Sequence, residues 1–272
     1  TAHADSSIGL YAGDARTYDL FSPLFKAVIN EYHHFSGQAP HQSDLTPMEL
    51  DNPDPDQTFI RSTRIRVARS LSGFPFPCHI TAAERKQVEA MAREAFKTLP
   101  EGFSGRYISY TNSPEQTILN ALDQGILFRK GDRFQEAAGI NRDFPQARGI
   151  YHSDDQRFRV WVNEEDHLRI MAVEKSADIS AVFNHLGRGL TILGSRLEFS
   201  THPLYGFLNS CPTNIGTAMR AGVHICLEKL ETKPDLLNQI VSDHHLQVRG
   251  TAGEKTRVEQ SVFDISNQQR LG

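Results

Sequence analysis

The chain has 272 residues, of which 39% are hydrophobic and 23% charged, and its formal net charge is −4. This composition is typical of a soluble globular protein with one or two domains. The net charge argues against a nucleic-acid binder, and no apolar run is long enough to span a bilayer. Three widely spaced cysteines form neither a disulfide framework nor a zinc pattern, which predicts a reducing cytoplasmic location.

Helical periodicity predicts a first helix over residues 14–35, with Asp14 as N-cap and Pro23 as a point of splitting or kinking. Its repeating apolar positions are Tyr18, Phe21, Leu24, Phe25, Val28, Ile29 and Tyr32. Residues 36–57 are rich in Pro, Asp, Gln and Ser, which predicts a linker.

Four further helices are predicted from capping signals and periodicity. One begins at Thr81, where Glu84 completes a capping box, and its expected buried positions are Val88, Met91, Ala95, Phe96 and Leu99. Another begins at Ser113, with Pro114 as the first helical residue. The last two cover residues 179–197 and 234–244. Strands are predicted over 59–69, 105–110, 147–152, 157–171, 205–210, 218–228, 246–249 and 261–265. Many strands with few short βαβ units favour a mixed or antiparallel sheet with helices packed on it.

An arginine-rich stretch covers residues 62–69. On a strand, Arg64 and Arg66 share one face, while Ile65 and Val67 face the core. Two guanidinium groups about 7 Å apart suit a polyphosphate, because each can bind two oxygens. The alternative is a solvated strand face on which arginine serves solubility.

Residues 161–169 read Trp-Val-Asn-Glu-Glu-Asp-His-Leu-Arg. If a strand continues through them, alternation puts Trp161, Asn163, Glu165, His167 and Arg169 on one face. Such a face would make a poor core and a suitable wall for a charged pocket. The pattern therefore predicts a site that holds phosphate next to a cationic acceptor.

Three other segments supply candidate ligands. Arg220, Gly222 and His224 alternate with apolar residues, and Gly222 allows a ligand to approach the backbone. Cys211 precedes a Pro-Thr-Asn turn, and nearby cationic segments are expected to lower its pKa toward the thiolate; a small buried cysteine is the alternative. Arg249 leads into a Gly-Thr-Ala-Gly loop that either closes over a ligand or is an ordinary surface turn.

Because P-loop and GxGxxG patterns are absent from the sequence, a nucleotide would be bound by arginines.

Six segments resemble the phosphagen (ATP:guanidino) kinases, and among them the arginine kinases: STRIRVARSLSGFPFP, RGIYH, VWVNEEDHLRI, CPTNIGTAMRAGVHI, LQVRGTAGE and FDISNQQRLG. The resemblance covers essentially the whole chain and implies an α+β fold. Residues 1–45 would be the truncated remnant of a small all-α N-terminal domain with the substrate-specificity loop. Residues 46–272 would be a catalytic domain with an antiparallel sheet flanked by helices, itself truncated at its C-terminal end.

The resemblance also implies reversible transfer of the ATP γ-phosphoryl group to the guanidino nitrogen of L-arginine for energy buffering, with Mg²⁺ and ATP or ADP, by a monomer or homodimer. The nucleotide would be bound by Ser62, Thr63, Arg64, Ile65, Arg66, His152, Arg169, Arg220, Ala221, Gly222, Val223, His224, Arg249, Gly250, Thr251, Ala252, Gly253 and Glu254. The acceptor would be bound by Ser7, Ile8, Gly9, Tyr11, Glu165, Cys211 and Glu254.

The resemblance gives chemical roles to three of these side chains and to two acidic neighbours of Glu165. Glu165, Glu254 and Cys211 would be catalytic, with Glu165 as the base, Glu254 as a second clamp on the guanidinium and Cys211 as a thiolate against it. Glu164 and Asp166 would orient waters around Mg²⁺, with no direct protein ligand to the metal. Proximity and charge stabilisation then dominate, because phosphoryl transfer leaves little covalent work to the protein.

The identity of the acceptor is less specific than the reaction type. Glu254 and the short loop with Tyr11 resemble the arginine type, whereas Ser7 stands where that pattern has Gly, so taurocyamine or another guanidine remains an alternative. A protein-arginine kinase is a second alternative, against which the loop at residues 6–11 argues. A nucleotide-binding fragment without activity is the third.

Overall fold

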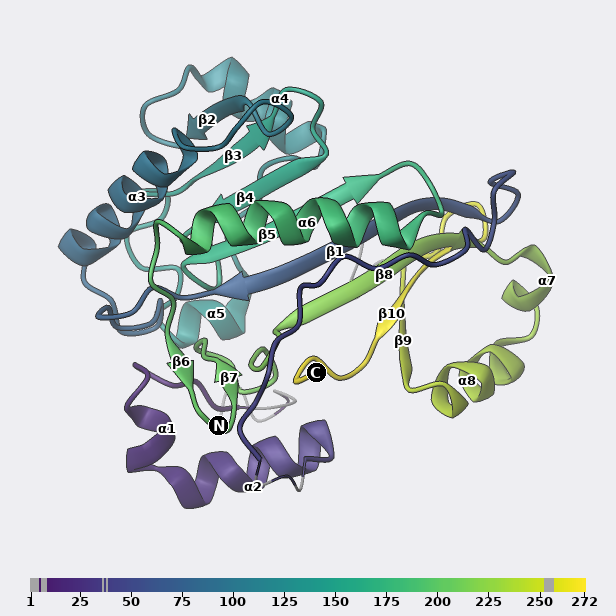
Figure 1. Ribbon diagram of the computed structural model, residues 1–272, viewed down its shortest axis with the longest axis horizontal. Helices are drawn as coiled ribbons and strands as arrows, with labels where there is room; N and C mark the ends of the chain where they lie inside the picture. The colour runs from purple at the N-terminus through teal and green to yellow at the C-terminus, as the bar shows by residue number, and fades with distance from the viewer. Residues whose placement is uncertain (1–4, 6–8, 36, 38, 252–256) are drawn as a thin grey trace.

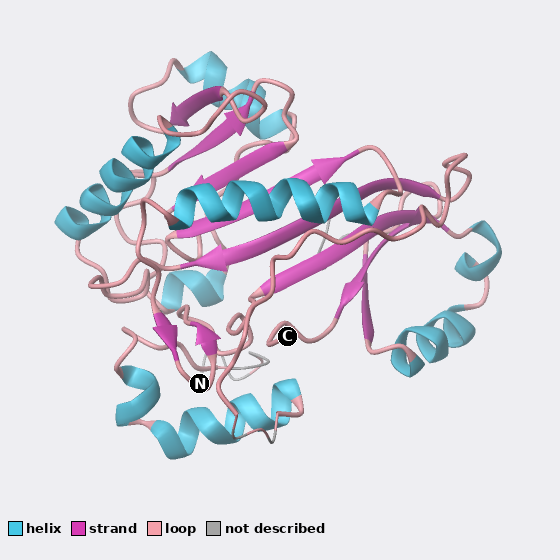
Figure 2. Cartoon of the chain, in the orientation of Figure 1, coloured by secondary structure: helices cyan, strands magenta, loops and turns pink. Residues whose placement is uncertain are grey.

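The computed structural model describes residues 5, 9–35, 37, 39–251 and 257–272. In this part of the chain, eight strands form one antiparallel sheet in the order β2-β3-β4-β5-β1-β8-β10-β9 (Figures 1 and 2). They are β1 (Ile60–Arg69), β2 (Gly105–Ser109), β3 (Gly149–Ser153), β4 (Phe158–Val162), β5 (Leu168–Glu174), β8 (Met219–Cys226), β9 (Leu246–Arg249) and β10 (Val262–Asn267). A separate pair consists of β6 (Thr201–His202) and β7 (Gly206–Phe207).

Helices lie around this sheet and confirm the predicted α+β class. They are α1 (Thr17–Leu20), α2 (Ser22–His33), α3 (Ala82–Phe96), α4 (Glu115–Asp123), α5 (Arg133–Ala137), α6 (Ile179–Gly194), α7 (Glu228–Glu231) and α8 (Pro234–Asp243). None of the helices in the described ranges combines the length and apolar character needed to cross a membrane.

One face of the sheet is the main hydrophobic core. Helix α6 lies along this face (Figure 1) and packs on β5, β1 and β4. Ile65 and Val67 point into it, each 1% exposed, as the alternation of β1 predicts. Gly189 brings α6 very close to the sheet, since a Cβ there would lie 2.4 Å from the ring of Phe158. The apolar face thus fixes the positions of the strands that carry polar groups on the other side.

Helix α3 packs on the same core and begins as the sequence predicts. Thr81 and Glu84 form a reciprocal capping box. The predicted buried stripe is wrong at Met91, which is 40% exposed, whereas Ala92 is fully buried. The stripe follows Val88 and Ala92 because a spacing of four residues keeps side chains on one helical face.

The first predicted helix is split into α1 and α2 at Phe21, with Pro23 in the first turn of α2. Tyr18 and Phe25 are buried against the segment that includes Leu208. The expected burial of Phe21 and Leu24 is wrong, because they are 58% and 51% exposed on the side of the helices away from that segment.

Part of the predicted linker is attached to α6. The backbone N–H of Met48 donates to Asn184 Oδ1 at 2.9 Å, and Asn184 Nδ2 donates back to the Met48 carbonyl at 2.8 Å. The N–H of Leu50 donates to Ser180 Oγ at 2.8 Å. Residues 39–57 therefore form an extended strap with no helix or strand, and α6 holds it through side chains.

Several predicted boundaries are wrong. The predicted strand over 157–171 is two strands, β4 and β5, joined by a turn at residues 163–167. The strand predicted at 205–210 contains only the two residues of β7. Pro114 precedes α4 instead of opening it, and the short helix α5 was not predicted.

Candidate active site

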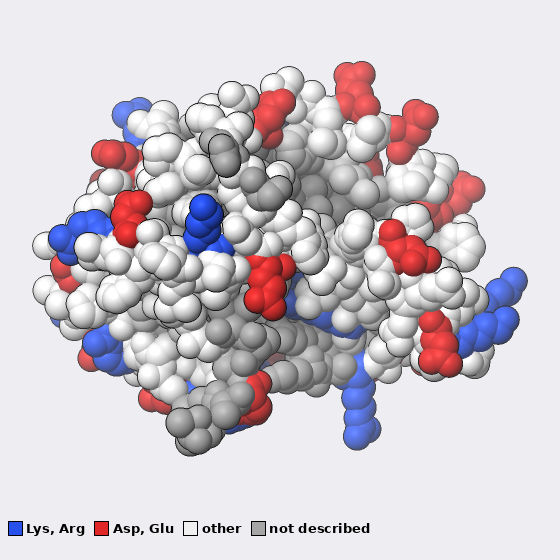
Figure 3. Space-filling model, turned by 90° about the horizontal axis from the view of Figure 1, so that it is seen from below, with Lys and Arg blue, Asp and Glu red and all other residues white. Residues whose placement is uncertain are grey.

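The face of the sheet opposite α6 carries the arginines. Arg66 of β1 lies beside Arg220 of β8, and Arg64 lies beside Gly222. Arg169 of β5 reaches the same face from the other side of β1. Seen from below, basic side chains lie at the bottom of a hollow with an acidic group on its rim (Figure 3). The alternation of three neighbouring strands therefore gathers guanidinium groups on one floor.

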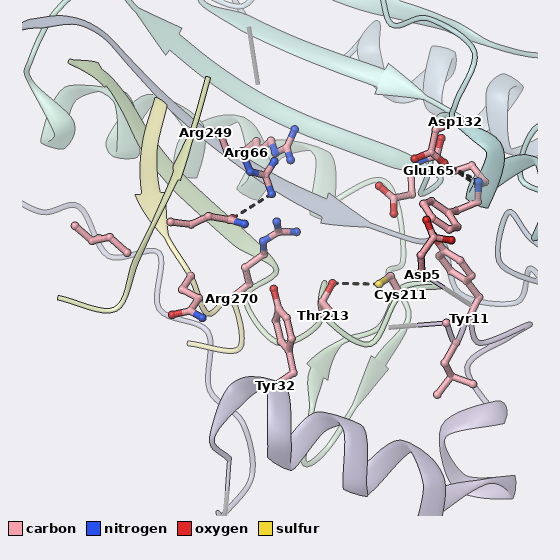
Figure 4. Close-up of a pocket in the computed structure, with 17 residues that line it drawn as sticks. Asp5, Tyr11, Tyr32, Arg66, Asp132, Glu165, Cys211, Thr213, Arg249 and Arg270 are labelled. Carbon is pink, nitrogen blue, oxygen red and sulfur yellow. Dashed lines mark hydrogen bonds between the residues drawn. The ribbon is translucent and has the colours of Figure 1, made fainter. Parts of the chain in front are cut away.

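A cavity of about 760 Å³ opens over this floor. Its lining is cationic at one end, acidic at the other, and carries a thiol between them (Figure 4). The cationic end has Arg66, Arg249 and Arg270, the acidic end has Asp5, Asp132 and Glu165 beside Tyr11, and Cys211 and Thr213 lie between. Such a cavity can hold a polyanion and a cation side by side.

The positive charge of the floor is only partly neutralised. Asp264 accepts a hydrogen bond from Arg220 Nη2 at 2.8 Å and lies 3.7 Å from Arg64. Arg66 has no ion pair or hydrogen bond to any of the described residues. Burial, together with the charges of Arg169, Arg64 and Arg270, lowers the pKa of Arg66 well below its usual value. Buried cations without counter-ions favour the binding of an anion.

The turn at residues 163–167, which we call the carboxylate turn, carries three acidic side chains. Arg169 binds the carboxylates of Glu164 and Glu165, each at 2.8 Å. Asp166 is fully buried and accepts from Asn214 Nδ2 at 2.7 Å. Burial and the neighbouring charge of Glu165 raise the pKa of Asp166 to about 8. Glu165 is the member of this group that reaches the cavity.

Two of the predicted inward-facing residues do not face the cavity. Asn163 and His167 are 2% and 0% exposed and point into the protein, so the expected single face from Trp161 to Arg169 is wrong. The reason is that the strand stops at Val162, and the turn changes the direction of the side chains.

Cys211 lines the cavity, with its Sγ 3.1 Å from Thr213 Oγ1. Burial and then the charge of Glu165 raise the pKa of its thiol to about 12. The expectation of a pKa lowered by cationic neighbours is therefore wrong for the protein without ligand. Its nearest strong charges are carboxylates, since the arginines lie at the other end of the cavity.

The acidic end combines the N-terminal segment with α5. Tyr11 and Gly9 line the cavity as expected, and Asp5 forms an ion pair with Arg133 of α5. Burial and the charge of Glu165 raise the pKa of Tyr11, so its hydroxyl stays protonated and can donate a hydrogen bond. Ser7 and Ile8, also expected to bind the acceptor, lie outside the described residues.

Some residues expected to bind the nucleotide point to the other side of the sheet. Thr63, Ile65, Ala221 and Val223 alternate with the arginines and face the core side, where Thr63 Oγ1 donates to the Ser176 carbonyl at 2.7 Å. The side chains of these four residues therefore point away from the arginine floor, as strand alternation requires. Gly222 leaves no open space either, because a Cβ there would press on the β10 backbone at 3.1 Å.

The two expected histidines occupy different positions. His224 is on the arginine face and its Nδ1 lies 2.9 Å from Ser62 Oγ. His152 is on β3, separated from β1 by β4 and β5, and its ring nitrogens contact Arg106 Nε and the Ser153 carbonyl. The structure therefore does not bring His152 to the cavity.

The loop after β9 is described only in part. Arg249, the last residue of β9, lines the cavity, and Gly250 follows it. Thr251 Oγ1 donates to the Val262 carbonyl at 2.6 Å. The expected ligands Ala252, Gly253 and Glu254 lie outside the described residues. Within the described ranges, no group of three or more His, Cys, Asp or Glu side chains could hold a metal.

Sequence reasoning missed several residues that line the cavity: Asp5, Tyr32, Asp132, Phe134, Gln135, Thr213, Gln247, Gln268 and Arg270. Arg270 follows β10 in an irregular segment, where alternation gives no direction to a side chain. The sequence feature that could have identified Arg270 as a site residue is its positive charge shortly after the FDISN segment, which is predicted to be a strand. Tyr32 was assigned to the helix core because its spacing fits, although it faces the cavity.

Comparisons with known proteins place this geometry in a family. The model described as "ATP:guanido phosphotransferase, C-terminal catalytic domain" matches residues 87–272, and the model for the N-terminal domain matches residues 1–30. The chain is 44% identical to an arginine kinase of Anthopleura japonica, over 98% of this chain and 38% of that protein. It is 42% identical to the arginine kinase of Penaeus monodon, over 98% of this chain and 76% of that protein.

Solved structures agree. A lombricine kinase superposes with a TM-score of 0.90 at 35% identity, over 96% of this chain and 74% of that one. The duplicated taurocyamine kinase from Schistosoma mansoni, with bound components of a transition-state analogue, gives the same TM-score and identity over 96% and 37%. The chain thus spans less than half the length of some relatives and about three quarters of others. The chain belongs to the ATP:guanido phosphotransferase family.

Proposed function

We propose that this protein catalyses the reversible transfer of the γ-phosphoryl group of MgATP to the guanidino nitrogen of L-arginine. The observation that carries the proposal is the division of the cavity into a cationic end, with the uncompensated Arg66, and an acidic end at Glu165. Arginine is the preferred acceptor because the relatives at 41–44% identity are named arginine kinases. Residues 1–45 would contribute to the acceptor end and residues 46–272 to the catalytic domain.

The cationic end would bind and activate the nucleotide. Phosphate oxygens would supply the counter-charge that Arg66 lacks among the described residues, with Arg249 and Arg270 in the same wall and Arg64 and Arg220 on the same floor. Guanidinium groups bind phosphate oxygens in pairs, and they would neutralise charge on the transferring group. The hydrogen bonds from Arg220 to Asp264 and Ser266 hold its guanidinium before the ligand arrives.

The acidic end would bind and orient the acceptor. A guanidinium is a poor nucleophile because its charge is delocalised and its pKa is high. The Glu165 carboxylate would fix its plane for in-line attack and accept its proton, while Arg169 holds that carboxylate at 2.8 Å. A guanidinium beside Cys211 would also reverse the local charge that now raises the pKa of the thiol.

A magnesium ion would enter bound to the nucleotide and neutralise part of the phosphate charge. Mg²⁺ commonly keeps several waters and uses few carboxylates, which fits a site whose described residues provide no cluster of protein ligands. Asp166 Oδ1 is buried with no hydrogen-bond partner in the described part of the chain, so it can accept from a water. Glu164 would act in the same way from beside Arg169.

The alternatives differ in the acceptor or in turnover. The lombricine and taurocyamine kinases, at 35% identity, share the fold and leave another guanidine as a second acceptor candidate. A protein-arginine kinase would need an acceptor end open to a polypeptide, whereas Asp5 and Tyr11 close part of this cavity. The unpaired cysteines fit the cytoplasmic location that we propose.

A coupled ADP-release assay with MgATP tests the proposal. The panel is L-arginine, taurocyamine, creatine, glycocyamine and an unfolded arginine-rich protein. Turnover with L-arginine at the highest kcat/KM supports the proposed acceptor. A higher value with another guanidine keeps the chemistry and overturns the acceptor. Thermal stabilisation by MgADP without any turnover indicates a nucleotide-binding fragment.

A further inference from the structure

We infer that Asn163 is a positioning residue for the proposed phosphotransfer, and that its amide locks the carboxylate turn in the geometry that Glu165 needs. This inference rests on the proposed function, because the role it assigns is the placement of the proposed base. Asn163 stands directly after β4 and directly before the three acidic residues. Its side chain is 2% exposed and does not line the cavity.

The backbone of Asn163 starts the turn in a conformation that few residues adopt. Its φ is +57°, in the left-handed region, and its N–H donates to the His167 carbonyl at 2.8 Å. Glycine is the default residue for such a conformation, and asparagine is one of the few others that adopt it at low cost. Backbone conformation alone would therefore be satisfied by glycine.

The asparagine side-chain amide donates hydrogen bonds that glycine cannot form. Its Nδ2 donates to the Ala147 carbonyl at 2.8 Å and to the Arg85 carbonyl at 3.1 Å. Its Oδ1 is buried without a partner among the described residues, which costs stability. The gain from the side chain must therefore come from its two donors, which join the turn to α3 and to the segment before β3.

A buried arginine side chain holds each of the two segments that Asn163 contacts. Arg85 is 1% exposed and forms a 2.8 Å ion pair with Asp143. Arg148 is 2% exposed, and its guanidinium donates to the Ile140 carbonyl at 2.7 Å. Arg148 also donates to the Gln146 and Arg142 carbonyls, so its guanidinium, together with the Arg85–Asp143 ion pair, holds residues 140–148 together. The amide of Asn163 thereby ties the carboxylate turn to a framework outside the cavity.

The position of the Glu165 carboxylate depends on Asn163 through the carboxylate turn. Glu165 is two residues from Asn163, and its carboxylate contacts Arg169 at 2.8 Å. A displacement of about 1 Å in a positioned group can reduce turnover by about 100-fold. Loss of the amide donors should therefore lower kcat while the nucleotide end, which lies on the other side of the cavity, keeps its affinity.

The test compares two equivalent substitutions. Asn163→Asp keeps size and left-handed tolerance but replaces the donor with an acceptor facing two carbonyls. Asn184→Asp makes the same change at an asparagine that donates to the Met48 carbonyl at 2.8 Å, on α6 and away from the cavity. Asn163→Gly keeps the backbone conformation and serves if the aspartate variant does not fold.

We expect a 10- to 100-fold lower kcat for the Asn163 variants, with KM for ATP within threefold of wild type and kcat of Asn184→Asp within twofold. Trp161, the single tryptophan of the chain, lies two residues before Asn163 and reports on the turn. Its acrylamide quenching should increase in the Asn163 variants and stay constant in Asn184→Asp.

Two results overturn the inference: unchanged kcat in a folded Asn163 variant, or a fall in thermal midpoint with kcat and quenching like those of Asn184→Asp. If wild type transfers no phosphoryl group to any guanidine, the proposed function fails by itself. Trp161 quenching and MgADP affinity of the same variants then still decide the positioning role. Increased quenching with retained MgADP affinity supports it, and wild-type quenching overturns it.

Discussion

The two faces of β1 differ in what they contribute, although their residues alternate along one strand. Ile65 and Val67 are buried in the core, whereas Arg64 and Arg66 are on the arginine face, where Arg64 lies 3.7 Å from Asp264 and Arg66 has no ion pair among the described residues. The first pair gives stability through apolar burial, and the second lowers stability in order to bind an anion. The strand shows that the fold and the site can be separated by substitutions one residue apart.

The largest effect should come from Glu165→Gln at the acidic end of the cavity. Loss of a general base typically reduces turnover by about 10²- to 10⁴-fold. Nucleotide affinity, measured by calorimetry with MgADP, should remain within threefold because Arg66, Arg249 and Arg270 lie at the other end of the cavity. An equal loss of turnover and nucleotide affinity would contradict the division of the cavity.

Arg66→Met should lower kcat/KM for ATP by about 100-fold, in line with the loss of two charge-assisted hydrogen bonds. The same change removes a buried guanidinium that is repelled by Arg169, Arg64 and Arg270. We therefore expect the thermal midpoint without ligand to rise by about 2–4 °C. A falling midpoint would show that Arg66 stabilises the fold, which would contradict the proposed difference between the two faces of β1.

The reactivity of Cys211 should follow the charge of its surroundings. Burial and Glu165 raise its thiol pKa to about 12, and only the thiolate is nucleophilic. Alkylation by iodoacetamide, followed in a Cys78→Ser, Cys226→Ser background without ligands, should accelerate about tenfold per pH unit from pH 8 to 10. A plateau below pH 9 would mean that the cationic groups control the thiol.

Val67→Ala tests the other face of the same strand. Removing two buried carbon groups and leaving a cavity should lower the free energy of unfolding by about 2 kcal/mol. The folded variant should keep wild-type kcat and KM, since Val67 is 1% exposed and points away from the arginine face. Denaturant titration measures the free energy of unfolding, and initial rates measure kcat and KM. A large change in KM for ATP would contradict the separate roles of the two faces.

Thr81→Ala should have the smallest effect. The substitution removes the acceptor of the capping box at the start of α3, which costs about 1 kcal/mol. Activity at 25 °C should be unchanged, because α3 contacts the core side of the sheet. Thr98→Ala, just after the C-terminal end of α3, provides a threonine control whose hydroxyl donates to the nearby Ala95 carbonyl.

Much of the fold follows from local patterns in the sequence. The alternation in β1, the capping box at Thr81 and the helix from Ile179 are all found where expected. The carboxylate turn was missed because a two-residue period continues through it, and only Asn163, with its tolerance of positive φ, signals a turn.

The site is harder to predict because its chemistry depends on neighbours that are distant in sequence. The pKa of Cys211 is raised by burial and then by Glu165, 46 positions earlier, and is not set by the arginines nearby in sequence. Arg270 and α5 contribute to the cavity from irregular or short segments that have no periodicity. Residue type could identify the chemistry, but only the fold decides which charges meet.

Phosphoryl transfer between the two ends of the cavity is tested most directly by ³¹P NMR of the reaction of MgATP with L-arginine. We expect a new phosphorus–nitrogen resonance that grows as the γ-phosphate signal of ATP falls, is reversed by added ADP, and is nearly absent with Glu165→Gln. Inorganic phosphate as the only product, or an equal rate with Glu165→Gln, would contradict phosphoryl transfer between the two ends of this cavity.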